Sequence, residues 1–144
     1  MDEIDRKIVT LLQGNARMAL KAIAEQTFLS SPAVAARIER LEREGVITGY
    51  HASVNPVKLG YHIMAFIRID VKPENKEEFY AFAGETPNVL ECSYVTGEYS
   101  MLLKVAFEST MGLDAFISNL QRFGRSSTQI VFSTHVGPRG VDVS

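Results

Sequence analysis

The chain has little of what holds a small protein together covalently or through a metal ion. It contains a single cysteine, Cys92, so no disulfide can form within the chain. Its three histidines, His51, His62 and His135, lie far apart and show no spacing typical of metal ligands. We therefore expect no metal site and no cofactor, and we interpret Cys92 as a small apolar residue of a strand.

Long apolar runs and an excess of positive charge are also absent. No stretch approaches the roughly 18 apolar residues of a membrane span, and the chain opens with MDEIDRK, which does not resemble a secretion leader. We expect a cytoplasmic protein with no membrane partner. The formal net charge of −2 argues against a protein that binds nucleic acid through bulk positive charge.

Any positive surface of the N-terminal part must be local. Residues 1–56 contain seven Lys or Arg and seven Asp or Glu. The acidic Asp2, Glu3 and Asp5 belong to the first helical stretch. The basic residues that could gather on another side are Arg17, Lys21, Arg37, Arg40 and Arg43.

The composition is that of an ordinary folded protein. Over 144 residues it has 46% hydrophobic and 22% charged residues, which predicts one domain or two small ones.

The most informative segment, residues 20–44, predicts two short helices joined by a tight turn. Ser30 and Ser31 are good helix caps, and Pro32 suits the first helical position. Apolar residues then recur with helical spacing at Val34, Ile38 and Leu41. The residues left to face outward are Ser31, Ala33, Arg37 and Arg40. This pattern is typical of a DNA-contacting helix, although an ordinary solvated helix has the same features.

The neighbouring segments complete a winged helix-turn-helix over residues 1–54. Residues 2–14 have a helical apolar stripe and end near Gly14. Residues 46–54 alternate in a way that predicts a short two-stranded wing with Gly49 near its bend. The residues that we expect to contact double-stranded DNA are Arg17, Lys21, Ser30, Ser31, Ala33, Arg37 and Arg40.

A hinge at residues 55–61, containing Pro56 and Gly60, separates this part from a second domain at residues 62–144. Strands are predicted at 63–71, 88–95, 100–107 and 127–136, with helices after Pro73 and after Ser109. The order strand, helix, strand, strand, helix, strand is that of a ferredoxin-like α+β domain, with both helices on one face of an antiparallel sheet.

The other face of this sheet is expected to carry apolar side chains that a monomer would expose. Such a patch commonly marks an interface, so the pattern predicts a homodimer formed sheet against sheet. A C-terminal tail or the linker is the alternative cover. The predicted interface residues are Met64, Phe66, Leu90, Tyr94, Leu102 and Val131.

Three stretches of the chain resemble the Lrp/AsnC family of transcription regulators. They are EIDRKIVTLLQGNAR, LSSPAVAARIERLEREGVITGYHASVNPVKLG and PNVLECSYVTGEYSMLLKV. The resemblance covers both domains. It implies sequence-specific DNA binding by the N-terminal domain, dimers often assembled into octamers, and a small effector, typically an amino acid, bound by the C-terminal domain.

The resemblance also implies where an effector binds. The matching residues are Thr96, Gly97, Glu98, Tyr99 and Ser100, with Ser127 and Thr128 as contributors. Two positions depart from the family pattern. Phe28 replaces a glycine in the turn between the helices, which is costly if the turn needs positive φ, although Phe28 could equally be a well-packed core residue. Ser100 replaces an aspartate.

Two other functions fit the same fold. An architectural protein could wrap DNA with little sequence preference. Relatives of the family also include tetrapyrrole decarboxylases, but the three histidines here are scattered and no catalytic pattern is visible. We therefore expect a regulator and not an enzyme.

Overall fold

The computed structural model describes all residues 1–144, and these form two compact units. The first unit comprises residues 1–53 together with residues 136–144, and the second comprises residues 54–135. The division into 1–54, 55–61 and 62–144 remains a prediction, and the structure groups the C-terminal tail with the helical unit instead. No helix combines the length and the apolar composition that crossing a membrane requires.

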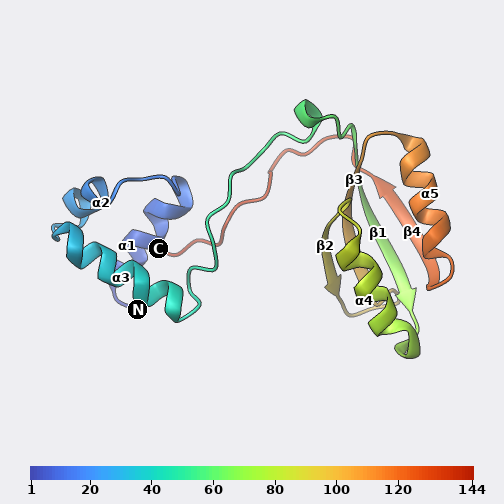
Figure 1. The fold of residues 1–144 in the computed structure, drawn as a ribbon, viewed down its shortest axis with the longest axis horizontal. Coiled ribbons are helices and arrows are strands. Elements are labelled where there is room, and N and C mark those ends of the chain that lie inside the picture. The colour runs from blue at the N-terminus through green and yellow to red at the C-terminus, as the bar shows by residue number, and fades with distance from the viewer. The chain divides into compact units, whose positions relative to one another are not determined.

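The first unit is built on three helices, α1 (Glu3–Gly14), α2 (Leu20–Thr27) and α3 (Ser31–Arg43) (Figure 1). Asp2 caps α1 through a reciprocal bond with Asp5, because each side chain accepts a hydrogen bond from the other's backbone amide. Ser30 caps α3 by accepting from the Ala33 amide at 3.2 Å, and Pro32 lies in the first turn as expected. Each helix contributes apolar residues to one core, whose buried members are Ile8, Ile23, Ala24, Val34 and Leu41.

The predicted wing is wrong for this structure. Residues 46–54 contain no strand and form no backbone ladder with one another. The amides of Val46 and Ile47 instead donate to the Leu41 carbonyl at the end of α3. Beyond them, Tyr50 donates a hydrogen bond to Glu42 at 2.9 Å. An isolated two-stranded ribbon is only marginally stable, and alternation alone does not supply the pairing that it needs.

The turn between α2 and α3 has the conformation that makes a bulky residue costly. Phe28 ends α2 with φ 58° and ψ 33°, in the left-handed region, and it is the one non-glycine residue of the chain with positive φ. Its side chain is 94% exposed, so Phe28 is not a core residue.

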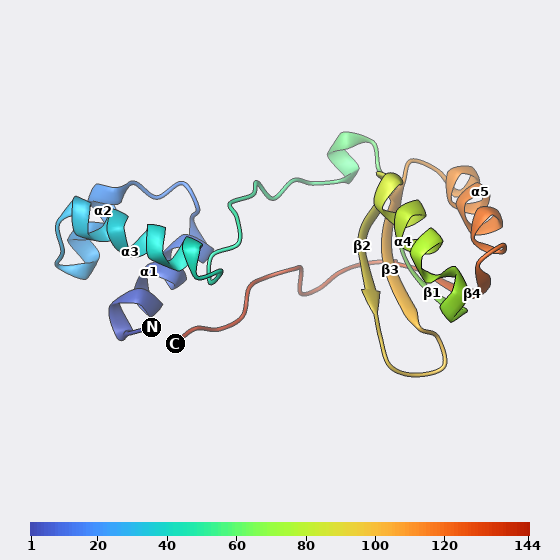
Figure 2. The same ribbon diagram turned by 60° about the horizontal axis from the view of Figure 1, so that its bottom comes forward.

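The second unit is the predicted ferredoxin-like α+β domain. Its strands β1 (Ile63–Val71), β2 (Val89–Tyr94), β3 (Met101–Phe107) and β4 (Gly124–Ile130) form an antiparallel sheet in the order β2-β3-β1-β4. The helices α4 (Lys76–Glu85) and α5 (Thr110–Leu120) lie on one side of this sheet, as Figure 2 shows. Two short 3₁₀ turns, η1 (Val57–Leu59) and η2 (Pro73–Asn75), precede β1 and α4.

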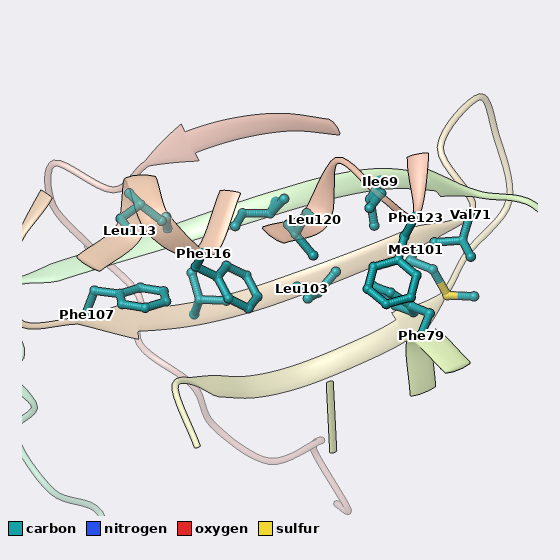
Figure 3. Close-up of a cluster of buried hydrophobic side chains, with 13 residues drawn as sticks. Ile69, Val71, Phe79, Met101, Leu103, Phe107, Leu113, Phe116, Leu120 and Phe123 are labelled. Atoms are coloured by element: carbon teal, nitrogen blue, oxygen red, sulfur yellow. The ribbon is translucent and has the colours of Figure 1, made fainter. Parts of the chain in front are cut away.

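Strand alternation places the core of this unit between the sheet and its helices. Ile67 and Leu103 are cross-strand partners and both are fully buried. Phe79 from α4 and Phe116 from α5 pack onto this layer, and Phe79 meets Phe123 edge to face at 5.4 Å between ring centroids (Figure 3). The residues that alternate with these on β1 and β3 face away from the helices, so one sheet face is left without a covering element.

Candidate nucleic-acid interface and effector site

The helix-turn-helix has an exposed start to its second helix. Ser30 is exposed, and Ser31 and Ala33 are partly exposed, in the first turn of α3. Arg17 and Lys21, before and at the start of α2, are also exposed and form no ion pair. In helix-turn-helix proteins, the N-terminal residues of the second helix contact base edges while the first helix crosses the DNA backbone. Ser30, Ser31 and Ala33 lie at the start of the second helix of the motif, and Arg17 and Lys21 lie before and at the start of the first.

Arg37 and Arg40 are placed differently from the prediction. The Arg37 Nη1 donates to both carboxylate oxygens of Asp2, at 2.9 and 2.8 Å, and to Asp5 at 3.1 Å. Arg40 donates through Nη2 to both oxygens of Asp5 at 2.7 Å. The expectation that these arginines gather away from the acidic start of α1 is therefore wrong. Residue spacing along α3 does not reveal that α1 crosses it with its acidic end.

These contacts form a charge cluster of two carboxylates and two guanidinium groups, which we call the α1–α3 clamp (Asp2, Asp5, Arg37, Arg40). Asp5 is its buried member, with a side chain only 1% exposed, whereas Arg37 and Arg40 remain 27% and 35% exposed. Burial opposes ionisation of Asp5, but hydrogen bonds from Arg40, the Asp2 backbone and Arg37 hold its pKa below the ordinary value. The hydrogen bond from Arg37 lowers the pKa of Asp2 to about 2.

The C-terminal tail lines one side of a groove in the same unit. The volume of this groove is about 560 Å³, and its walls come from α1, residues 46–51 and residues 141–143. Arg6 donates to the Val143 carbonyl and Gln13 donates to the Val141 carbonyl, each at 3.0 Å. The sequence contains no periodic signal for this contact, because the tail is extended and is held by side chains that any solvated helix could carry.

In the second unit, the proposed effector turn lies between β2 and β3. Gly97 has φ 110°, a conformation that favours glycine. Two guanidinium groups lie against the Tyr99 ring, with the Arg68 carbon at 4.9 Å and the Arg125 carbon at 5.1 Å from its centroid. Glu98 accepts a hydrogen bond from Arg125 at 2.7 Å. The turn is thus a surface cluster of one carboxylate and two guanidinium groups around Tyr99, with the exposed Thr96 at its start.

Ser100 is already engaged within the fold. Its hydroxyl oxygen accepts from the Val71 amide at 3.0 Å and the hydroxyl donates to the Val71 carbonyl at 3.4 Å. Ser127 and Thr128 do not lie together, because Ser127 pairs with Arg68 on the uncovered sheet face while Thr128 pairs with Ile67 on the helix side. Of these two residues, only Ser127 lies on the same sheet face as Arg68 and Arg125, the two arginines against the Tyr99 ring.

Only some of the residues predicted to form the dimer interface lie on the sheet face away from the helices. By register, Met64, Phe66 and Leu102 lie on the uncovered face, and the Val131 amide continues the ladder by donating to Met64. Tyr94 is not on this face. It pairs with the buried Met101, and Lys76 of α4 lies 4.0 Å from its ring centroid.

A register shift in β2 explains the error for Tyr94. The pairing passes from Val89 to Glu91, so Leu90 has no direct partner on β3. One extra residue in a strand exchanges the faces of all residues beyond it. Leu90 itself lines a small hollow beside Tyr80 and Gly84 of α4, so it also leaves the predicted interface.

Comparison with known proteins supports a DNA-binding helix-turn-helix unit followed by a ligand-binding unit. A family model described as winged helix-turn-helix DNA-binding matches residues 1–48, and one described as Lrp/AsnC ligand binding domain matches residues 64–141. The HTH-type transcriptional regulator LrpA of Bacillus subtilis is 35% identical over 91% of this chain and 97% of its own length. The regulator YezC of the same bacterium is 38% identical over 93% of this chain and 95% of its own.

Solved structures have the same fold over nearly the whole chain. A transcriptional regulator from Neisseria meningitidis, crystallised as a complex with L-methionine, is 26% identical with a TM-score of 0.89, covering 95% of this chain and 93% of its own. Both units are therefore matched together and in the same order. The chain belongs to the Lrp/AsnC family of DNA-binding transcription regulators.

Proposed function

We propose that this protein is a homodimeric transcription regulator that binds double-stranded DNA through α2 and α3 and responds to a small effector at the β2–β3 turn. The observation that carries the DNA-binding part is the exposed, Ser30-capped start of α3 beside a short α2. Arg17 and Lys21 supply cations that no carboxylate neutralises. In this proposal they contact phosphates, and Ser31 and Ala33 contact base edges.

Selection from a random duplex library tests this part. We expect an enriched motif with two half-sites about 10 base pairs apart. Lys21→Ala should weaken binding to all duplexes alike and lower the slope of affinity against salt by about one. The matched control is Lys58→Ala, an exposed lysine outside the helical unit. Tight binding with no enriched motif would favour the architectural alternative.

The dimer part rests on the apolar half of the uncovered sheet face. Phe66 is 38% exposed although it lies in β1, one of the two central strands of the sheet. Met64 and Leu102 lie near it on the same face. Burying a charge there without a partner is costly. Phe66→Glu should therefore yield monomers in sedimentation velocity, whereas Tyr94→Glu, on the other face, should not. A Phe66→Glu protein that remains dimeric would reject this face as the interface.

The family resemblance implies an amino-acid effector, but the residues of the β2–β3 turn do not favour one. A free amino acid brings an ammonium group that favours an anionic acceptor. Ser100 is neutral and bonded to Val71, and Glu98 is already paired with Arg125. We therefore propose that common amino acids bind weakly and that the native effector differs. Calorimetric titration with leucine, methionine, phenylalanine, lysine and asparagine tests this, and micromolar binding of any of them would contradict it.

We also propose that the chain acts by binding and not by catalysis, which its similarity to named transcriptional regulators supports. Its one fully buried carboxylate, Asp5, is held by two arginines and does not face a substrate cavity. An absorbance titration with a tetrapyrrole checks the enzyme alternative. Saturable binding followed by decarboxylation would contradict the proposal.

A further inference from the structure

Phe28 combines two unfavourable features in one residue. Its φ of 58° places it in the left-handed region, where a β-carbon crowds the backbone and glycine does not. Phe28 is also 94% exposed to solvent. A residue that is both strained and exposed does not contribute to folding in an evident way, and such residues concentrate at functional sites.

The rest of the turn does not depend on the ring. The bond that closes α2 is made by the Phe28 backbone amide to the Ala24 carbonyl, which any residue provides. The next residue, Leu29, packs against the core of the helical unit. No aromatic ring or cation lies against Phe28. The phenyl group is therefore available to something outside the chain.

The position of Phe28 indicates what that is. Phe28 lies two residues before Ser30, the cap of α3, and so borders the helix start that we propose to contact bases. Phosphates do not attract a phenyl ring, whereas the thymine methyl group is an apolar feature of the major-groove edge that side chains such as Phe contact. A protein partner is less suited, because a stable interface buries about 1,200 Å² or more and one aromatic side chain supplies only about 200 Å².

We infer that Phe28 packs against a thymine methyl in the major groove and so makes this chain prefer thymine at one position of each half-site. This inference rests on the proposed DNA binding by α2 and α3. It adds a specificity-determining residue in the turn itself, outside the helix that contacts the other bases.

The experiment uses the full chain and a duplex that the wild-type protein selects. Each thymine is replaced in turn by deoxyuridine, which lacks only the methyl group, and affinity is measured by fluorescence anisotropy. At one thymine per half-site the wild-type protein should lose about fourfold in affinity, the equivalent of one buried methyl-sized group. Phe28→Gly should bind the thymine duplex more weakly than wild type and show no further loss with deoxyuridine.

A stability measurement separates this from a folding defect. Glycine removes the left-handed strain, so the thermal midpoint of Phe28→Gly should not fall below that of wild type. Phe28→Asn, which also tolerates positive φ but carries a polar side chain, should behave like Phe28→Gly in binding.

Two results would overturn the inference while leaving the proposed function intact. One is equal affinity of wild type and Phe28→Gly for the thymine duplex. The other is an equal loss of affinity by both proteins at every deoxyuridine. Failure of the wild-type chain to select any duplex would instead contradict the proposed DNA binding, and it would be evident before a variant is made.

Discussion

Replacing Asp5 with asparagine is expected to destabilise the helical unit by about 2 kcal/mol. Asp5 is 1% exposed and accepts hydrogen bonds from both Arg40 and Arg37, so the change leaves two guanidinium groups without their buried anion. Removing one partner of a fully buried ion pair costs about 3–5 kcal/mol. The smaller value applies here because both arginines keep access to water, which screens the charge that remains.

Asp2→Asn is the matched control. It makes the same chemical change in the same clamp, but Asp2 is 55% exposed. Asparagine also caps a helix about as well as aspartate, so the start of α1 is retained. The expected loss of stability is therefore clearly smaller than for Asp5→Asn.

Native-state hydrogen exchange, followed by mass spectrometry on peptides of α1 and α3, measures the free energy of opening of this unit separately from the sheet domain. Asp5→Asn should accelerate exchange in both helices and leave peptides of β1 and β3 unchanged. Equal exchange rates in Asp5→Asn and wild type would refute the argument that the clamp stabilises the unit. An equal effect of the two variants would refute the role assigned to burial.

Other predictions follow from the same contacts. The folded-state pKa of Asp2, about 2, lies below its ordinary value of 3.8, so this group stabilises the folded unit above about pH 4 and the contribution is lost as the pH falls toward 2. Acid unfolding followed by circular dichroism should thus show wild type more stable than Asp2→Asn near pH 5, with the difference shrinking below pH 4 and vanishing only below pH 2; a constant difference would contradict the pKa. Deleting residues 141–144 removes the bonds from Arg6 and Gln13. It should speed exchange in α1 with a cost of no more than about 1–2 kcal/mol, because both bonds are exposed, and exchange identical to wild type would show that the tail is not docked in solution.

Much of the fold follows from the sequence because periodicity reports which side of an element is buried. The spacing of Ile4, Ile8 and Leu11 predicts α1, and the alternation through β1 predicts its buried face. The Ser30–Pro32 pair predicts the start of α3 because capping is a local interaction.

The errors arise where the result depends on partners elsewhere in the chain. The prediction of a wing is wrong because alternating residues form a strand only when another strand pairs with them, and residues 46–54 have no such partner. The predicted face of Tyr94 is wrong because an apolar pattern does not reveal the bulge at Leu90. The spacing of α3 predicts that Arg37 faces outward, but it gives no information on α1, whose Asp2 and Asp5 accept hydrogen bonds from Arg37.

A single carboxylate at the start of α3 tests the central claim, that this end of the helix contacts DNA. Ser31→Asp places a negative charge in a first turn, where it stabilises a helix but repels phosphates. Thr110→Asp makes the equivalent change at the first residue of α5, in the sheet domain. In fluorescence anisotropy with a selected duplex, Ser31→Asp should lose at least about tenfold in affinity while Thr110→Asp binds like wild type and both remain folded. Wild-type affinity in Ser31→Asp would contradict the assignment of α3 as the DNA-contacting helix.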